Sequence, residues 1–299
     1  MLSLFSIPKP FQGAMEIIQK NAIESWRLLH SECEVFLFGD EWGTEKAARE
    51  FGAIHIPNVV KNEFGTPLLQ KVFYDANKSA SYPLLCYLNT DIILFKDIIN
   101  AADRIHFNNF LMTGQRWDME INERIDFSSQ ERQMRLYQLM LKTGVRGAKS
   151  ALDYFLFPRN SRLIEIPAFA VGRPGWDNWF IFRARQLRIP VIDATDSVPI
   201  IHQNHDYAHV PAQRGKQWEG PEADWNRNLI GDQNHIFTLL DATHVLQGIH
   251  IKTAIGYRYI RRRWQTLAIL FPQFGFFIKI ISKILNLFKT LSAVKMKRN

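Results

Sequence analysis

Short apolar runs alternate with helical periodicity along the first part of the chain. Runs at 2–7, 35–38 and 84–88 predict buried strands, whereas apolar residues spaced three and four apart over 13–29 predict an amphipathic helix. Strands and helices that alternate in this way predict an α/β fold with a mainly parallel, mixed sheet flanked by helices. Ligands of such sheets bind beyond the carboxyl ends of the strands, so residues there are the first candidates for a site.

Three further segments have recognisable local patterns. Thr66 and Pro67 predict the start of a helix, because they supply a capping residue followed by proline in the first turn. Residues 128–143 have the length and composition of a helix, bounded by serines and a glycine. Residues 203–228 are rich in His, Gln, Asn and Trp and are interpreted as a polar loop.

The charge of the chain is concentrated near its carboxyl end. The formal net charge is +8, yet no acidic residue follows Asp241, whereas eleven Lys and Arg do. Within 264–294 the apolar residues cluster on one helical face and lysines lie opposite, which predicts a basic amphipathic helix. We therefore expect a folded domain at 1–255 and a basic amphipathic helical tail at 256–299. An anionic membrane surface is the expected partner of the tail, rather than nucleic acid; the alternative is a helix that packs on the domain.

The location is predicted to be cytoplasmic, peripheral at the inner face of the membrane. The apolar amino terminus lacks a basic start and is interrupted by Pro8 and Pro10, so it predicts a strand rather than a secretory leader. No uninterrupted apolar stretch is long enough for a spanning helix. Cys33 and Cys86 have no metal-type spacing and fit a reducing compartment.

Asp91 is the most informative acidic residue. It follows the apolar run 84–88 directly, where a buried charge requires a partner. Asn89 and Asp91 are two positions apart, so an extended backbone can direct both side chains to one side. Mg²⁺ prefers oxygen ligands and retains substrate phosphates, so one or two protein oxygens would suffice. Because Asn-Thr-Asp is also common turn chemistry, the alternative is an ordinary turn.

Two later segments add candidate chemistry. Asp177 stands at a predicted helix start after a segment with two glycines and a proline, where it caps the helix or titrates with a raised pKa among tryptophans. His202 and His205 belong to a stretch of three histidines in eight residues, which is either a metal-binding or a surface loop. Lys71 and Arg173 are candidates to balance phosphate charge.

The alternating amino-terminal half, with an Asn-x-Asp motif near residue 90, resembles the GT-A nucleotide-sugar transferases. The resemblance covers roughly residues 1–210, and Asn89 stands where the family has its first Asp. It implies Mn²⁺ or Mg²⁺ held by Asp91 and a late histidine, His202 or His205. Asn89 would contact the ribose or act through water.

The resemblance also implies roles outside the metal motif. Asp177 would be the base that deprotonates the acceptor hydroxyl in an inverting reaction. Asp40, after an early strand, would contact the nucleobase, with a turn aspartate as the alternative. Phe5 and Ser6 end the first strand, where the nucleotide of the family lies.

The expected function is transfer of a sugar, hexosyl or related, from a nucleotide-diphosphate donor to a hydroxyl acceptor. A UDP-sugar is the favoured donor, and the basic tail favours a lipid-linked or cell-surface glycan acceptor in polysaccharide biosynthesis. One alternative is a sugar-phosphate nucleotidyltransferase, which the absence of a Gly-x-Gly loop after the first strand disfavours. The other is a non-catalytic membrane-surface binding module, which leaves Asp91, Asp177 and the histidines without a role.

Overall fold

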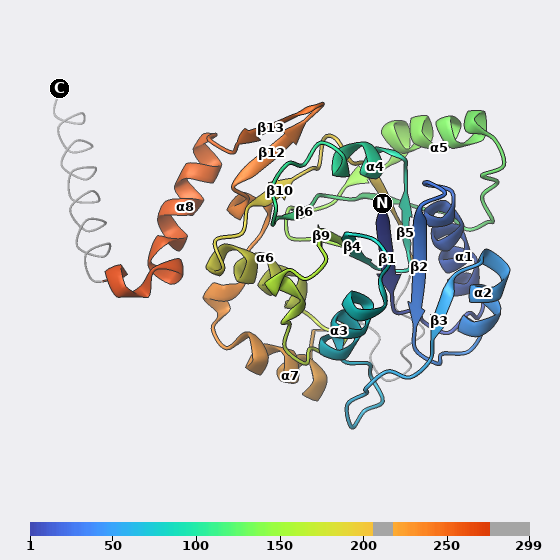
Figure 1. Cartoon of the computed structure of the whole chain (residues 1–299), viewed down its shortest axis with the longest axis horizontal. Coiled ribbons are helices and arrows are strands. Elements are labelled where there is room, and N and C mark those ends of the chain that lie inside the picture. Colours follow the sequence, from blue (N-terminus) through green and yellow to red (C-terminus); the bar gives the residue numbers. More distant parts are fainter. Residues whose placement is uncertain (206–217, 276–299) are drawn as a thin grey trace. The chain divides into compact units, whose positions relative to one another are not determined.

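The computed structural model describes residues 1–205 and 218–275 (Figure 1). The chain divides into two compact units, 1–254 and 255–299. The helix expected from Phe277 onward lies outside the described residues. Among the described residues, no helix combines the length and the apolar character that a bilayer span requires.

Nine described strands of the first unit form one mixed sheet, which confirms the predicted α/β fold. Its spatial order is β13-β12-β10-β6-β9-β4-β1-β2-β3. The pairs within β4-β1-β2-β3 and within β12-β10-β6 are parallel, whereas β9 is antiparallel to both of its neighbours. The bounds are β1 Leu2–Ser6, β2 Cys33–Phe38, β3 Ile54–Ile56, β4 Leu84–Leu88, β6 Leu111–Thr113, β9 Tyr154–Pro158, β10 Val191–Asp193, β12 His244–Gln247 and β13 His250–Thr253.

A second sheet of four short strands lies in the same unit. Its order is β5-β11-β7-β8, in which β11 runs antiparallel to β5 and parallel to β7. These strands are β5 Ile92–Leu94, β7 Trp117–Met119, β8 Val145–Arg146 and β11 Ile200–Gln203. The turn at 89–91 joins β4 to β5 and so connects the two sheets.

Side chains on the two faces of the large sheet differ in kind. Leu2, Leu4 and Val35 pack among mostly aliphatic residues of α1 and α2 together with Trp26, and both helices lie beside β2 and β3 (Figure 1). On the opposite face Phe5 contacts Phe73 edge-on, with 5.1 Å between ring centroids, beneath α3 and α6. The alternation of side chains along β1 therefore supplies two separate cores.

Helices of the first unit pack against both of its sheets. The α-helices are α1 Ala14–Arg27, α2 Thr44–Phe51, α3 Leu69–Ser79, α4 Asp97–Ala102, α5 Gln130–Thr143, α6 Trp176–Gln186 and α7 Pro221–Ile230 in the first unit, and α8 Tyr257–Leu270 in the second. Short 3₁₀ turns are η1 Arg162–Ile164, η2 Gln233–His235, η3 Leu239–Asp241 and η4 Pro272–Phe274.

Two local predictions were wrong. The helix expected from Thr66 begins at Leu69, because Pro67 and Leu68 form isolated β-bridges to Lys61 and Ala170. The polar loop expected over 203–228 contains the start of α7, which has proline in its first turn and acidic residues that favour a helix amino terminus. Residues 206–217 of that loop lie outside the described residues.

Candidate functional site

Strand register brings the candidate metal ligands together. His202 of β11 is paired with Ile92 of β5 on one side and with Asp118 of β7 on the other. Asp91 immediately precedes β5, and its carbonyl oxygen accepts a hydrogen bond from the backbone N–H of Gln203 at 3.1 Å. Pairing of these short strands therefore sets His202 between two carboxylates that are far apart in the sequence.

Asp91, His202 and His205 form a group that could hold a metal ion. The Oδ2 atom of Asp91 lies 3.1 Å from Nε2 of His205 and 3.8 Å from Nε2 of His202. One ligand atom from each of the three residues lies within 4.8 Å of the others. One carboxylate oxygen and two imidazole nitrogens are ligands that Mn²⁺ accepts, and Mg²⁺ suits the carboxylate more than the imidazoles.

The chemistry of Asp91 fits a cation at this position. The side chain is buried, and its Oδ1 atom has no hydrogen-bond partner among residues 1–205 and 218–275. Burial raises the pKa of Asp91, but the two imidazoles and Lys9 outweigh burial and hold that pKa well below its usual range. Asp91 is therefore an ionised carboxylate with an unused oxygen, which is costly unless a ligand satisfies it.

Arg116 links this group to a second buried acid. Its Nη1 atom donates to both oxygens of Asp153, at 3.1 and 2.9 Å, and its Nε atom lies 2.8 Å from Oδ1 of Asp118. Asp153 also accepts a hydrogen bond from Nδ2 of Asn89 at 2.9 Å. The predicted residue Asn89 thus contacts the acid next to the metal group and holds the turn in place.

Asp177 lies at the first turn of α6, close enough to Asp153 and Arg116 to feel both charges. Gly175 precedes it with a positive φ of 89°, and a Cβ there would lie 2.7 Å from Ile230, so glycine is required at this turn. Burial, with a further contribution from Asp153, raises the pKa of Asp177 to about 7. A carboxyl group with a pKa near neutrality can act as a general base.

The tryptophans on either side of Asp177 belong to the core. Trp176 packs edge-on against Tyr87, with 5.1 Å between ring centroids, and Trp179 packs against Phe169 at 5.2 Å. Both are buried. Their contacts support α6 and so fix the position of Asp177.

The predicted phosphate-binding cations have acidic partners. Lys71 pairs with Asp75 on the exposed side of α3, and Arg173 pairs with the buried Glu222 at the start of α7. Among the described residues, neither of them contacts Asp91, His202 or His205, and their role toward a donor stays a prediction.

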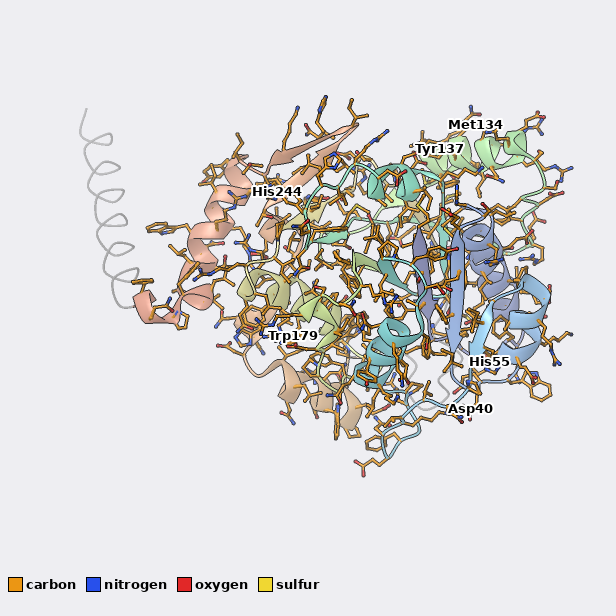
Figure 2. All side chains as sticks on the ribbon, viewed as in Figure 1. Asp40, His55, Met134, Tyr137, Trp179 and His244 are labelled. Carbon is orange, nitrogen blue, oxygen red and sulfur yellow. The ribbon has the colours of Figure 1, made fainter. Side chains whose placement is uncertain are left out.

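The residues predicted to contact the nucleotide lie at the ends of β1 and β2. Asp40 is exposed at the end of β2, where its carboxylate accepts a hydrogen bond from Lys61 at 2.6 Å; Figure 2 shows it at the edge of the molecule near His55. Phe5 and Ser6 are fully buried, and the Ser6 hydroxyl donates to the carbonyl of Leu88 at 2.5 Å. These nucleotide contacts also stay predictions.

Sequence analysis missed Arg116, Asp118 and Lys9. Lys9 is half-buried, and burial lowers its pKa although the nearby Asp91 raises it. Arg116 directly precedes β7 and Asp118 lies within it, and one charged residue at every second position was the available signal. That signal is weak without knowledge of which strand β7 pairs with.

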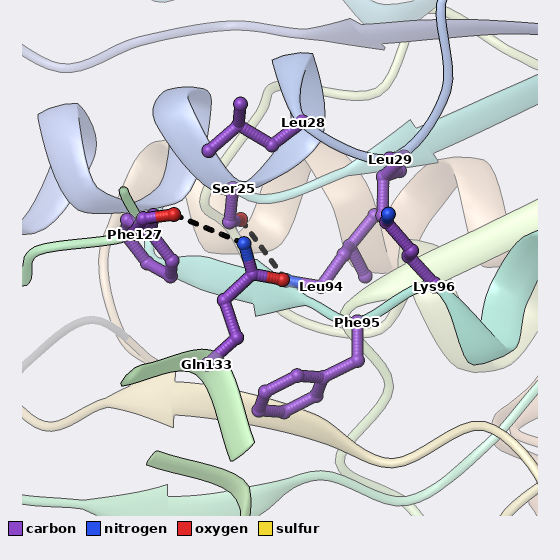
Figure 3. Close-up of a pocket in the computed structure, with 8 residues that line it drawn as sticks. All are labelled: Ser25, Leu28, Leu29, Leu94, Phe95, Lys96, Phe127 and Gln133. Atoms are coloured by element: carbon purple, nitrogen blue, oxygen red, sulfur yellow. Dashed lines mark hydrogen bonds between the residues drawn. The ribbon is translucent and has the colours of Figure 1, made fainter. Parts of the chain in front are cut away.

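A small pocket lies elsewhere in the first unit (Figure 3). It is lined by residues at the carboxyl ends of α1 and β5 and just after them, together with Phe127 and Gln133. The side-chain amide of Gln133 donates to the Phe127 carbonyl at 3.0 Å. None of the candidate site residues lines it. Its wall combines apolar side chains with Ser25, Lys96 and Gln133, and we assign no function to it.

Comparisons with known proteins give weak structural similarity. No protein-family model and no curated protein matches the chain. Similar solved structures include S. aureus TarS 1-349 in complex with UDP, with 14% identity and a TM-score of 0.32 over 43% of this chain and 39% of that chain. The chain thus covers well under two thirds of that structure.

Two further similar structures are matched over more of their length. The mannosyltransferase PcManGT from Pyrobaculum calidifontis, in complex with GDP-Man and Mn²⁺, has 10% identity and a TM-score of 0.42 over 78% of this chain and 70% of that chain. Glucosyl-3-phosphoglycerate synthase of M. tuberculosis has 12% identity and a TM-score of 0.43 over 85% and 86%. Similarity at this level does not establish function, which has to be inferred from the site itself.

Proposed function

We propose that the chain is a metal-dependent glycosyltransferase of the GT-A type, which moves a sugar from a nucleoside-diphosphate donor to a hydroxyl acceptor. The observation that carries the proposal is the group formed by Asp91, His202 and His205 beyond the end of β4, with one buried carboxylate oxygen that no described residue satisfies. A donor diphosphate and a divalent cation would together complete this group.

The proposed roles follow from the contacts. Asp91 and one or both histidines would hold Mn²⁺ or Mg²⁺, and Asn89, fixed by Asp153, would contact the ribose or a bound water. When bound, the metal supplies positive charge that stabilises the leaving diphosphate.

Asp177 is the proposed base. Its pKa of about 7 lets it exist as a carboxylate at neutral pH and still accept a proton from the acceptor hydroxyl. The hydroxyl oxygen then bonds to the anomeric carbon as the bond to the diphosphate breaks. Attack from the face opposite the leaving group inverts the linkage.

The function is tested by donor hydrolysis. Purified protein is incubated with a panel of UDP- and GDP-sugars, with Mn²⁺, Mg²⁺ or EDTA, and the released nucleoside diphosphate is measured. Slow metal-dependent release from one donor, lost in Asp91→Ala, is the expected result and identifies the sugar. If no donor is hydrolysed and neither metal nor nucleotide raises the thermal unfolding midpoint, the chain is not a transferase.

A membrane-linked acceptor is the finer part of the proposal, and α8 supports it. Tyr257, Ile260 and Trp264 are spaced three and four apart on this helix and are exposed. Four arginines lie between them, and α8 contains no acidic residue. Aromatic and apolar side chains among arginines are typical of helices that lie in an anionic membrane interface.

Vesicle binding tests this role of the second unit. Ile260→Glu with Trp264→Glu should abolish co-sedimentation with vesicles rich in phosphatidylglycerol, and pure phosphatidylcholine should bind little protein. Trp42→Glu is the matched control, because Trp42 is an exposed tryptophan of the first unit. Equal binding of the double variant and the wild-type protein would contradict the anchor and the lipid-linked acceptor, while the donor assay would stand.

A further inference from the structure

His202 has two different neighbours at its two ring nitrogens. Its Nδ1 atom lies 2.9 Å from Oδ1 of Asp118, and its Nε2 atom faces Oδ2 of Asp91 at 3.8 Å. The first distance is that of a direct hydrogen bond, whereas the second leaves room between the two atoms. The ring is therefore held from one side and open to a ligand on the other.

We propose that Asp118 is the positioning residue of the metal centre, and that it fixes His202 in the tautomer whose Nε2 atom can bind a cation, with Arg116 holding Asp118 in place. A carboxylate has only acceptors, so the hydrogen bond requires the proton to be on Nδ1. The lone pair is then on Nε2, which faces Asp91. A carboxylate behind a histidine ligand also increases its basicity toward a metal.

Arg116 explains how Asp118, on a short strand, can hold the ring of His202 in one orientation. Asp118 is partly exposed on the three-residue strand β7, where its side chain would otherwise rotate freely. The guanidinium forms an ion pair with Asp118, in which Nε lies 2.8 Å from Oδ1 without hydrogen-bond geometry, and it donates through Nη1 to the buried Asp153. One rigid planar group therefore lies against both acids. Asp153 is in turn held by Asn89 of the metal-binding turn. A series of side-chain contacts thus runs from His202 to the turn that carries Asp91, through Asp118, Arg116, Asp153 and Asn89.

The tautomer can be measured in the wild-type protein without any variant. Long-range ¹H–¹⁵N spectra of the metal-free protein, at a pH where the ring is neutral, should show His202 with its proton on Nδ1. The exposed His30 supplies the internal reference, because its Nδ1 atom accepts a hydrogen bond from the backbone N–H of Glu32 at 3.0 Å and its proton is then on Nε2. A neutral His202 that carries its proton on Nε2 would overturn the proposal, even if no variant of Asp118 folds.

Variants of Asp118 test the consequence for metal affinity. This arm rests on the proposed function, because it assumes that Asp91 and His202 bind a cation. Titration with Mn²⁺ alone, followed by electron paramagnetic resonance, should show about 10–100-fold weaker binding in Asp118→Ala. Asp118→Asn should stay within about threefold of the wild-type protein, because Arg116 directs the amide oxygen, rather than the NH₂ group, toward itself and His202.

Two controls separate the possible failures. Asp126→Ala also removes an aspartate that pairs with an arginine, Arg132, but at an exposed position outside the site, and it should bind Mn²⁺ like the wild-type protein. Asp118→Ala with unchanged Mn²⁺ affinity, or Asp118→Asn as weak as Asp118→Ala, would overturn the positioning role alone. A wild-type protein whose Mn²⁺ binding is absent, or unaffected by Asp91→Ala, would overturn the proposed function instead.

Discussion

Two groups of charged residues follow strands that run in the same direction, and they differ in how they are partnered. Asp40 follows β2 and is an exposed carboxylate paired with Lys61. Asp91 follows the end of β4 and is buried against two histidines, with one oxygen unsatisfied. Because β2 and β4 are both parallel to β1, the two acids lie at the same edge of the sheet.

The difference shows which of the two acids is evidence for a ligand. An exposed ion pair contributes about 0.2–1 kcal/mol and explains its own residues. A buried oxygen without a partner costs about 1–3 kcal/mol, which the folded protein alone does not recover. We infer function from Asp91 because its arrangement is costly without a ligand, whereas that of Asp40 is not.

The largest expected effect is on kcat, and it follows from replacing Asp177, the proposed base. Asp177→Asn keeps the shape of the side chain but removes its basicity, so transferase kcat should fall by about 10²–10⁴-fold with little change in Mn²⁺ affinity. In the wild-type protein kcat/KM should rise with pH through about 7 and level off above it, because the base must be ionised. Rates are measured over a pH series with the donor and acceptor found to react.

The same variant makes a prediction about stability. The folded pKa of Asp177 is raised, so the folded state binds the proton more tightly than the unfolded chain does. Its contribution to stability is present at low pH and is lost as pH rises through the folded value of about 7. Asp177→Asn should therefore be more stable than the wild-type protein at pH 8, by about 1–2 kcal/mol, and show no such gain at pH 4. Denaturant unfolding of both proteins at pH 4 and pH 8 measures this difference in stability. For the kinetic prediction, a kcat of Asp177→Asn within threefold of the wild-type value would show that Asp177 is not the base.

The contrast also explains how far the sequence could predict this site. Asp91 could be found because a charged residue directly after an apolar strand is a local signal. Asp118 could not, because it meets His202 through pairing of β7 with β11, and the two residues are 84 positions apart. The register between short strands has no local signature.

The fold also could be predicted where local patterns determine it, and could not where contacts between distant segments do. β1, α1 and β2 are regular elements with clear periodicity, and they were recognised from it. The helix expected at Thr66 was displaced to Leu69 by contacts of residues 67 and 68 with distant segments, which local propensity does not include.

An intermediate effect is expected at the buried ion pair between Glu222 and Arg173. Among the described residues, neither partner contacts the metal group. Glu222 accepts hydrogen bonds from Arg173 and Asn62, so Glu222→Ala leaves a half-buried guanidinium without its partner. The free energy of unfolding should fall by about 2–4 kcal/mol, with unchanged Mn²⁺ affinity. Thermal and denaturant unfolding measure it.

The matched control for Glu222 is on the same helix. Asp224 pairs with Arg227 at an exposed position, and Asp224→Ala should cost less than about 1 kcal/mol. Similar losses in the two variants would show that burial does not separate the classes of ion pair, and would weaken the inference from Asp91 as well.

The smallest expected effect on stability is at Asp40. Its replacement should change nucleotide affinity more than it changes the free energy of unfolding. Asp40→Asn removes an exposed pair and should change the free energy of unfolding by less than about 0.5 kcal/mol. If Asp40 contacts the nucleobase, loss of one hydrogen bond should weaken binding of the nucleoside diphosphate by about 3–10-fold. Isothermal titration with the diphosphate of the reactive donor measures this, and Glu45→Gln, which changes an exposed pair with Arg49 on α2, is the control. Unchanged nucleotide affinity in Asp40→Asn would leave Asp40 a turn residue, and the donor site would then rest on the buried group alone.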